Sequence, residues 1–150
     1  MNLFNTLSSF VVLLYLIISS LHDIKTHTIS VKLSVCTIII CTIMKLFAFD
    51  YDIYTLFMWL ICGCIVGSFL LILSFLSKEG LGYGDGIALI VTGIGSGLKI
   101  SFLTCGFAFI TASVYACFLL IMKRNKNASF PFLPFICAAY LLQLLILWTS

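Results

Sequence analysis

The chain contains only five acidic side chains that could carry acid and base chemistry, namely Asp23, Asp50, Asp52, Glu79 and Asp85. Two carboxyl groups held within a few ångströms in a partly dry site cannot both ionise cheaply, so one of them keeps its proton. Such a pair supplies a base and an acid together. The ionised member takes a proton from water while the protonated member donates one to a carbonyl oxygen.

Asp23 and Asp85 are the two acids that lie at the ends of apolar runs. Asp23 directly follows the first run, and Asp85 lies at the beginning of the fourth. An ionisable side chain at membrane depth is costly and is therefore a candidate for function. Each also has a structural explanation when taken singly: Asp23 as a charge at a helix end, and Asp85 as an acid stabilised by the dipole at a helix N-terminus.

The other three acids have simpler interpretations. Asp50 and Asp52 lie in a short connection between two apolar runs, where water can solvate their charges. Glu79 is a candidate for binding a positively charged segment of a substrate, but it also fits a solvated charge beside Lys78.

The composition places the chain in a membrane. Hydrophobic residues make up 63% of the 150 residues and charged residues only 9%, whereas an ordinary soluble domain has about 25% charged residues. The apolar runs are continuous and lack the alternation of barrel strands. The net charge of +3 is small and dispersed, which excludes a nucleic-acid surface. We expect one integral membrane domain over residues 1–150.

Six apolar runs are each near the length of about 20 residues that a membrane-spanning helix uses. We therefore predict an all-α, polytopic membrane protein with six transmembrane helices. The first run has no Lys or Arg before it, so we expect a permanent helix there and not a cleaved signal. A five-helix arrangement stays open, because the fourth run begins with a glycine-rich segment. The expected spans are 3–21, 31–49, 54–76, 81–98, 100–122 and 131–148.

The distribution of Lys and Arg predicts the orientation, because positive charges stay on the cytoplasmic side. The second and fourth connections have only Lys45 and Lys99 near them. Both termini should therefore lie outside, with Asp23 and Asp85 on the cytoplasmic face of the plasma membrane. The first, third and fifth connections hold the remaining basic residues: Lys25, Lys32, Lys78, Lys123, Arg124 and Lys126.

Glycine and cysteine indicate packing and not ligand binding. Gly63 with Gly67, and Gly93 with Gly97, have the spacing that lets helix backbones approach closely, and we expect them to pack helices within the chain. The seven cysteines are scattered through apolar runs without a C-x-x-C pair. We predict no metal site and no cofactor.

A glycine-rich segment, GLGYGDG, surrounds Asp85 over residues 80–86. Glycines beside a carboxylate let the backbone approach closely and adopt unusual dihedral angles. The pattern formed by Gly82, Gly84 and Asp85 resembles the GxGD signature of intramembrane aspartic peptidases. We therefore expect Gly82 and Gly84 to support the site through the backbone.

The segment DIKTHTIS over residues 23–30 is similar to the aspartate-led basic loop of type IV prepilin peptidases, with Ser30 where that family usually has proline. The separation of Asp23 from Asp85, the six apolar runs and the PFLPF segment at 131–135 also match. Ile87 stands where many members have lysine. The resemblance implies a membrane aspartic endopeptidase that removes the basic leader from prepilin-like substrates on the cytoplasmic side, with Asp23 and Asp85 as the catalytic pair and no methyltransferase segment.

Two other functions stay open. A small membrane transporter or channel subunit could use Asp85 as a proton or ion relay. A presenilin-like GxGD protease would use the Tyr51 and Asp52 pair, but the expected orientation places that pair on the wrong face. Membrane lipids are expected partners, because the basic cluster at 123–126 fits anionic headgroups.

Overall fold

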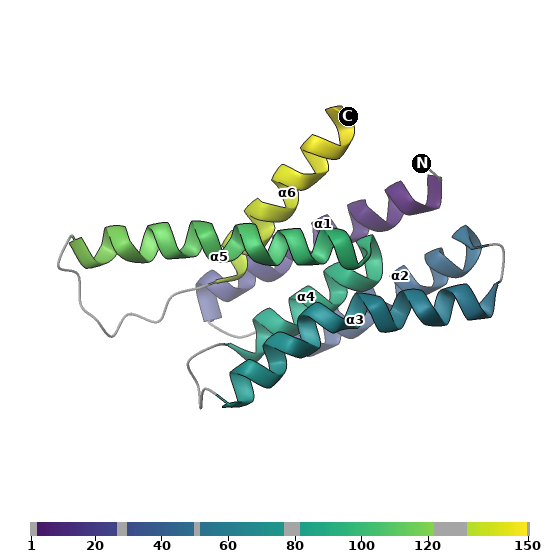
Figure 1. Cartoon of the computed structure of the whole chain (residues 1–150), viewed down its shortest axis with the longest axis horizontal. Coiled ribbons are helices and arrows are strands. Elements are labelled where there is room, and N and C mark those ends of the chain that lie inside the picture. Colours follow the sequence, from purple (N-terminus) through teal and green to yellow (C-terminus); the bar gives the residue numbers. More distant parts are fainter. Residues whose placement is uncertain (1–2, 27–29, 50–51, 77–81, 122–131, 150) are drawn as a thin grey trace.

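A computed structural model describes residues 3–26, 30–49, 52–76, 82–121 and 132–149 of the chain. Over these residues the fold is all-α, with six helices and no strand, as the sequence predicts. Figure 1 shows their arrangement. The helices are α1 (Leu3–Thr26), α2 (Val31–Ala48), α3 (Ile53–Leu76), α4 (Tyr83–Ser96), α5 (Leu98–Ile121) and α6 (Leu133–Thr149).

Among the described residues, four helices are long and apolar enough to cross a membrane: α1, α2, α3 and α5. The apolar part of α6, Leu133–Leu147, is shorter. The whole of α4 has 14 residues, which corresponds to about 21 Å, whereas the hydrocarbon core is about 30 Å thick. A multi-pass membrane protein is therefore indicated, but the fourth expected span, 81–98, is shorter than predicted.

Glycines delimit α4 at both ends. Gly82 precedes the helix in an extended conformation. Gly97 follows it with a backbone φ of 95°, an angle that residues with a side chain rarely adopt. The Gly97 N–H closes the last turn by donating to the Gly93 carbonyl oxygen at 2.8 Å. The apolar run of 81–98 does not reveal this stop, because it continues directly into α5.

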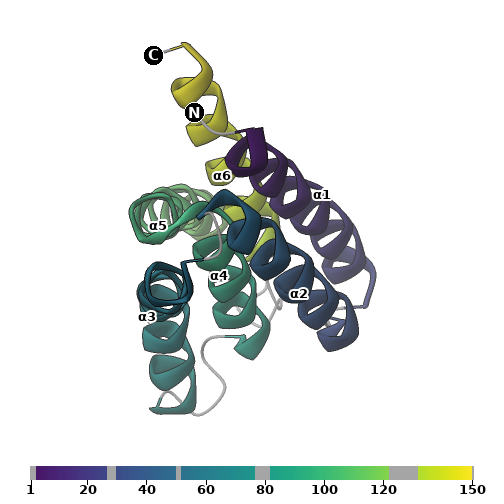
Figure 2. The same ribbon diagram turned by 90° about the vertical axis from the view of Figure 1, so that its right-hand side faces the viewer.

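Successive helices run in alternating directions, so their ends gather at two sides of the bundle (Figure 1). α1, α3 and α5 end on the side where α2, α4 and α6 begin, and we call this side the aspartate end because it holds Asp23 and Asp85. Both chain termini lie at the opposite end, close together in Figure 2. This alternation agrees with the expected placement of the two termini on one side.

The shortest helix occupies the centre of the bundle. α4 packs against α1, α2, α3 and α5, and it lies between α2 and α3 in Figure 2. Nine of its residues are buried, among them Leu89 and Val91, which are fully inaccessible. The surrounding helices leave their outer apolar side chains exposed, as expected for surfaces that face lipid. Because α4 is held by packing against four other helices, the residues in its first turn are also held in place.

Glycines allow α3 and α4 to touch backbone to backbone. A Cβ atom at Gly63 would lie 2.7 Å from the Gly93 carbonyl oxygen, and one at Gly67 would lie 2.6 Å from the Gly86 carbonyl oxygen. This confirms that Gly63 and Gly67 pack helices within the chain. Gly97 differs from the prediction: it lies outside α4, in the turn before α5, where a Cβ would meet the Trp59 ring at 2.8 Å.

Candidate active site

Asp23 lies on α1 itself. The sequence places it after a helix ending at residue 21, but α1 continues to Thr26. The Asp23 side chain is 9% exposed, and the neighbouring Ser19 and Ser20 are also buried. Polar residues near the helix end therefore point partly into the bundle and do not form a loop at this position.

Asp85 lies in the first turn of α4, and its side chain is likewise 9% exposed. Its backbone N–H donates to the Gly82 carbonyl oxygen at 3.1 Å, which closes the turn that begins the helix. A Cβ atom at Gly82 would lie 3.1 Å from Asp85 Oδ2. The missing side chain at Gly82 thus leaves room for the Asp85 carboxyl.

The packing of α1 on α4 places the two aspartates at the same end of the bundle. At the opposite end, Ser8 Oγ donates to the Gly95 carbonyl oxygen at 2.9 Å. At a rise of 1.5 Å per residue, Asp23 lies about 22 Å from this contact toward the end of α1. Asp85 lies about 15 Å from it toward the beginning of α4. Because the helices are antiparallel, both displacements lead toward the aspartate end.

The electrostatics of Asp85 reflect this arrangement. Asp85 and Asp23 are both buried carboxyls at the aspartate end. Charged carboxylates lose hydration when they are buried, and a second negative charge nearby opposes ionisation. Two carboxyls in this situation favour keeping one proton between them.

The first turn of α4 contacts α3 before α3 ends, so Asp85 does not lie at the outermost level of the bundle. A Cβ atom at Gly86 would meet Leu71 Cδ2 at 2.7 Å, and α3 continues five residues further, or about 8 Å, to Leu76. Phe75 and Leu76 are 73% and 70% exposed, whereas Ser74 between α3 and the bundle is 1% exposed. The sequence interpretation did not identify Ser74, although its spacing of seven residues from Gly67 places both on one face of α3.

The remaining predicted residues lie elsewhere. Gly84 is half-buried within the first turn of α4, whereas Glu79 and the basic cluster at 123–126 lie outside the described residues. Asp52 is exposed at the opposite end, where its carboxylate accepts hydrogen bonds from the Tyr54 N–H and the Thr55 hydroxyl. It begins α3 as a capping residue, so the simple interpretation of Asp52 is confirmed.

The described part of the chain contains no group of three or more His, Cys, Asp or Glu side chains that could hold a metal ion. All seven cysteines are free, and Cys41 and Cys137 are buried among apolar side chains.

Comparison with known proteins identifies the family. The model of the type IV leader peptidase family matches residues 10–120, which is more than half of the chain and includes both Asp23 and Asp85. Searches of curated proteins and of solved structures each gave no match. The family match agrees with the resemblance seen in the residues around both aspartates, and the chain belongs to the type IV leader peptidase family.

Proposed function

We propose that this protein is a membrane aspartic endopeptidase that cleaves the basic leader from type IV prepilin-like precursors at the cytoplasmic face of the plasma membrane. Asp23 and Asp85 form its catalytic pair, with backbone support from Gly82 and Gly84. The observation that carries the proposal is the burial of both carboxyls, Asp23 near the end of α1 and Asp85 at the beginning of α4, at the same end of the bundle. Membership of a leader peptidase family supports the same reaction.

The reaction needs one proton on the pair. Asp23 takes a proton from a water molecule, the water oxygen attacks the peptide carbonyl carbon, and Asp85 donates its proton to the carbonyl oxygen. When the tetrahedral intermediate breaks down, a hydroxyl proton returns to Asp85. The proton held by Asp23 moves to the amide nitrogen as the carbon–nitrogen bond breaks. Both carboxyls then regain their starting states, so the cycle requires no further reactant.

The depth of the pair supports a substrate with a polar leader joined to an apolar helix. Beyond its contact with the first turn of α4, α3 continues for about 8 Å and ends with the exposed apolar residues Phe75 and Leu76. An apolar substrate helix lying in the bilayer would bring its polar end to this level. The proposed six-helix crossing, with α4 and α6 completing the bundle, places the leader in the cytoplasm because basic residues gather on that side.

The direct test is cleavage of a purified prepilin-like substrate by the full chain in liposomes. We expect Asp23→Asn and Asp85→Asn each to lower kcat by about 10²–10⁴-fold, the contribution of a positioned acid or base. Asp52→Asn is the matched control, because it makes the same change at an exposed position and asparagine also caps helices. Normal cleavage by either Asp23→Asn or Asp85→Asn would disprove the catalytic pair.

The same proteins separate hydrolysis from ion transport. A proton or ion relay through Asp85 predicts a flux across the liposome membrane that Asp85→Asn abolishes, without any substrate cleavage. The proposed peptidase predicts cleavage by the wild type and no flux that depends on Asp85. Both readouts come from one preparation, so cleavage and flux are compared on the same protein.

A further inference from the structure

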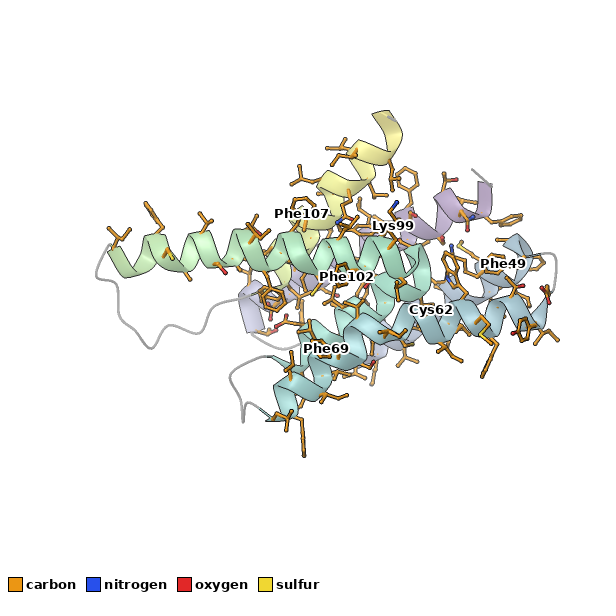
Figure 3. All side chains as sticks on the ribbon, in the orientation of Figure 1. Phe49, Cys62, Phe69, Lys99, Phe102 and Phe107 are labelled. Carbon is orange, nitrogen blue, oxygen red and sulfur yellow. The ribbon has the colours of Figure 1, made fainter. Side chains whose placement is uncertain are left out.

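A line of buried polar side chains leads along α1 to Asp23. Tyr15, Ser19 and Asp23 are each at most 9% exposed, and their spacing of four residues places them on one side of the helix. The outer surface of the bundle is different: Phe69 on α3 and Phe102 on α5, both labelled in Figure 3, are exposed apolar side chains. Polar groups inside such a bundle require partners within the protein.

The Tyr15 hydroxyl finds its partner on α2. Its Oη lies 2.8 Å from Ser34 Oγ, and Ser34 Oγ donates to the Ser30 carbonyl oxygen at 3.3 Å. Ser34 has a single hydroxyl proton, so with that proton directed to Ser30, the Tyr15 hydroxyl donates to Ser34. Both side chains are buried, Tyr15 being 2% and Ser34 1% exposed. A hydrogen bond therefore attaches α1 to the first turn of α2, at the aspartate end.

This hydrogen bond restricts the rotation of α1 about its axis. Val12 and Leu16 are buried beside Tyr15, but apolar contacts have no preferred direction. A hydrogen bond has both a preferred length and a preferred direction. Side chains reach about 5–6 Å from a helix axis, so a rotation of about 10° would move the Asp23 carboxyl by about 1 Å. A displacement of that size is enough to impair a catalytic group.

We propose that Tyr15 is a positioning residue for the peptidase reaction. Through its hydrogen bond to Ser34 it fixes the rotation of α1 and so holds the Asp23 carboxyl toward Asp85. Asp23 lies eight residues beyond Tyr15, or about 12 Å along the helix, so Tyr15 acts through α1 and transfers no proton itself. The inference rests on the proposed function of the two aspartates.

The matched variants Tyr15→Phe and Tyr140→Phe test the proposal in the cleavage assay with liposomes. Tyr140 is fully buried on α6, and its hydroxyl bonds with the Ser96 hydroxyl and donates to the Ser9 carbonyl oxygen at 3.2 Å. Each variant therefore removes one buried hydroxyl that links helices, and each should lower the thermal unfolding temperature. We expect Tyr15→Phe to lower kcat about tenfold with little change in KM. Tyr140→Phe should keep kcat near the wild-type value.

The pH profile supplies a readout that a purely structural role would not change. The negative charge of one carboxyl helps the other to keep the shared proton, and this effect weakens as the two move apart. The fall of kcat/KM at high pH should therefore begin at a lower pH in Tyr15→Phe than in the wild type. Tyr140→Phe should leave the profile unchanged.

Ser34→Ala removes the other partner of the hydrogen bond. It should lower kcat as Tyr15→Phe does, and the double variant should lose no more than either single variant, because both changes remove the same interaction. This variant also carries the test if Tyr15→Phe does not fold. Equal kcat values for Tyr15→Phe and Tyr140→Phe, with cleavage by the wild type intact, would overturn the role of Tyr15 and leave the catalytic pair standing. Absence of cleavage by the wild type would overturn the proposed function together with this role.

Discussion

The Asp85 carboxyl is buried at the beginning of α4, at the same end of the bundle as the Asp23 carboxyl. Gly82 lies beside it and has no side chain that would occupy its space. The sequence predicted that Asp23 and Asp85 lie at the same end of the bundle, because acids are few and the apolar runs alternate in direction, whereas their pairing and the role of Gly82 are our proposal. The sequence did not predict that Asp23 is part of α1. His22 and Lys25 interrupt the apolar run, but the helix continues past them to Thr26. Lys45 and Gln143 were also missed, because burial of single polar residues in an apolar run depends on neighbours far along the chain.

Proton uptake by Asp85 predicts the pH dependence of cleavage. The proposed reaction needs one proton on the pair of Asp23 and Asp85, and this proton is lost as the pH rises. Because Asp85 donates it, kcat/KM should fall toward high pH. The measurement is kcat/KM between pH 5.5 and 9, where we use about half-unit steps to resolve a single ionisation. Asp52→Asn should leave the profile unchanged, and a flat profile across this range would contradict the role of Asp85 as the acid.

Gly82→Ala should disturb the position of the Asp85 carboxyl. The added Cβ would lie 3.1 Å from Asp85 Oδ2, so the carboxyl must move by a few tenths of an ångström. We expect kcat to fall about tenfold, because catalytic groups tolerate only small displacements. The thermal unfolding temperature in detergent serves as the control and should change little, since Gly82 lies at an exposed helix beginning. Unchanged kcat would show that Gly82 does not shape the site.

The pairing of α3 with α4 holds the catalytic element in place. Six apolar runs were sufficient to predict six helices, and the small-residue spacing in α3 was sufficient to predict close packing. The length of α4 was not predictable in the same way. Its end depends on the positive φ of Gly97, and a glycine in an apolar run is compatible with a continuous membrane helix.

Gly93→Ala should separate α3 from α4. A Cβ at Gly93 would overlap the Gly63 carbonyl oxygen, and both atoms involved belong to rigid helix backbones. We expect a loss of about 1–3 kcal/mol in the free energy of unfolding, as for other overpacked sites. Unfolding in detergent measures this loss. Gly106→Ala is the matched control, because a Cβ at Gly106 meets nothing within 4 Å. Equal stability of the two variants would contradict the close packing of α3 on α4.

At the scale of the whole molecule, the alternation of basic connections and the direction of the helices agree. Both termini lie at one end of the bundle (Figure 1), and the end of α1 with Asp23 and the beginning of α4 with Asp85 lie at the other. The sequence predicted this arrangement because charge determines orientation independently of packing. It did not predict the central place of α4, since the choice of the helix surrounded by the others depends on contacts among all of them.

The orientation itself can be measured with epitope tags on intact spheroplasts. We expect tags at the N-terminus and at the C-terminus to bind antibody without permeabilisation, because both ends lie opposite the basic connections. A tag inserted at 125, between basic residues, should bind only after the membrane is opened. Antibody binding to that internal tag on intact spheroplasts would reverse the proposed orientation and place the aspartates outside.

The shortness of α4 has a consequence for how water reaches a hydrolase surrounded by lipid. α4 is about 9 Å shorter than the hydrocarbon layer is thick, and its opposite end is anchored to α1 through Ser8 and Gly95. Part of the mismatch therefore falls in front of Asp85, where α3 continues about 8 Å further. Bilayers respond to such a mismatch by thinning locally. We expect a shallow depression of the cytoplasmic leaflet over the first turn of α4, through which the solvent consumed in each turnover is replenished.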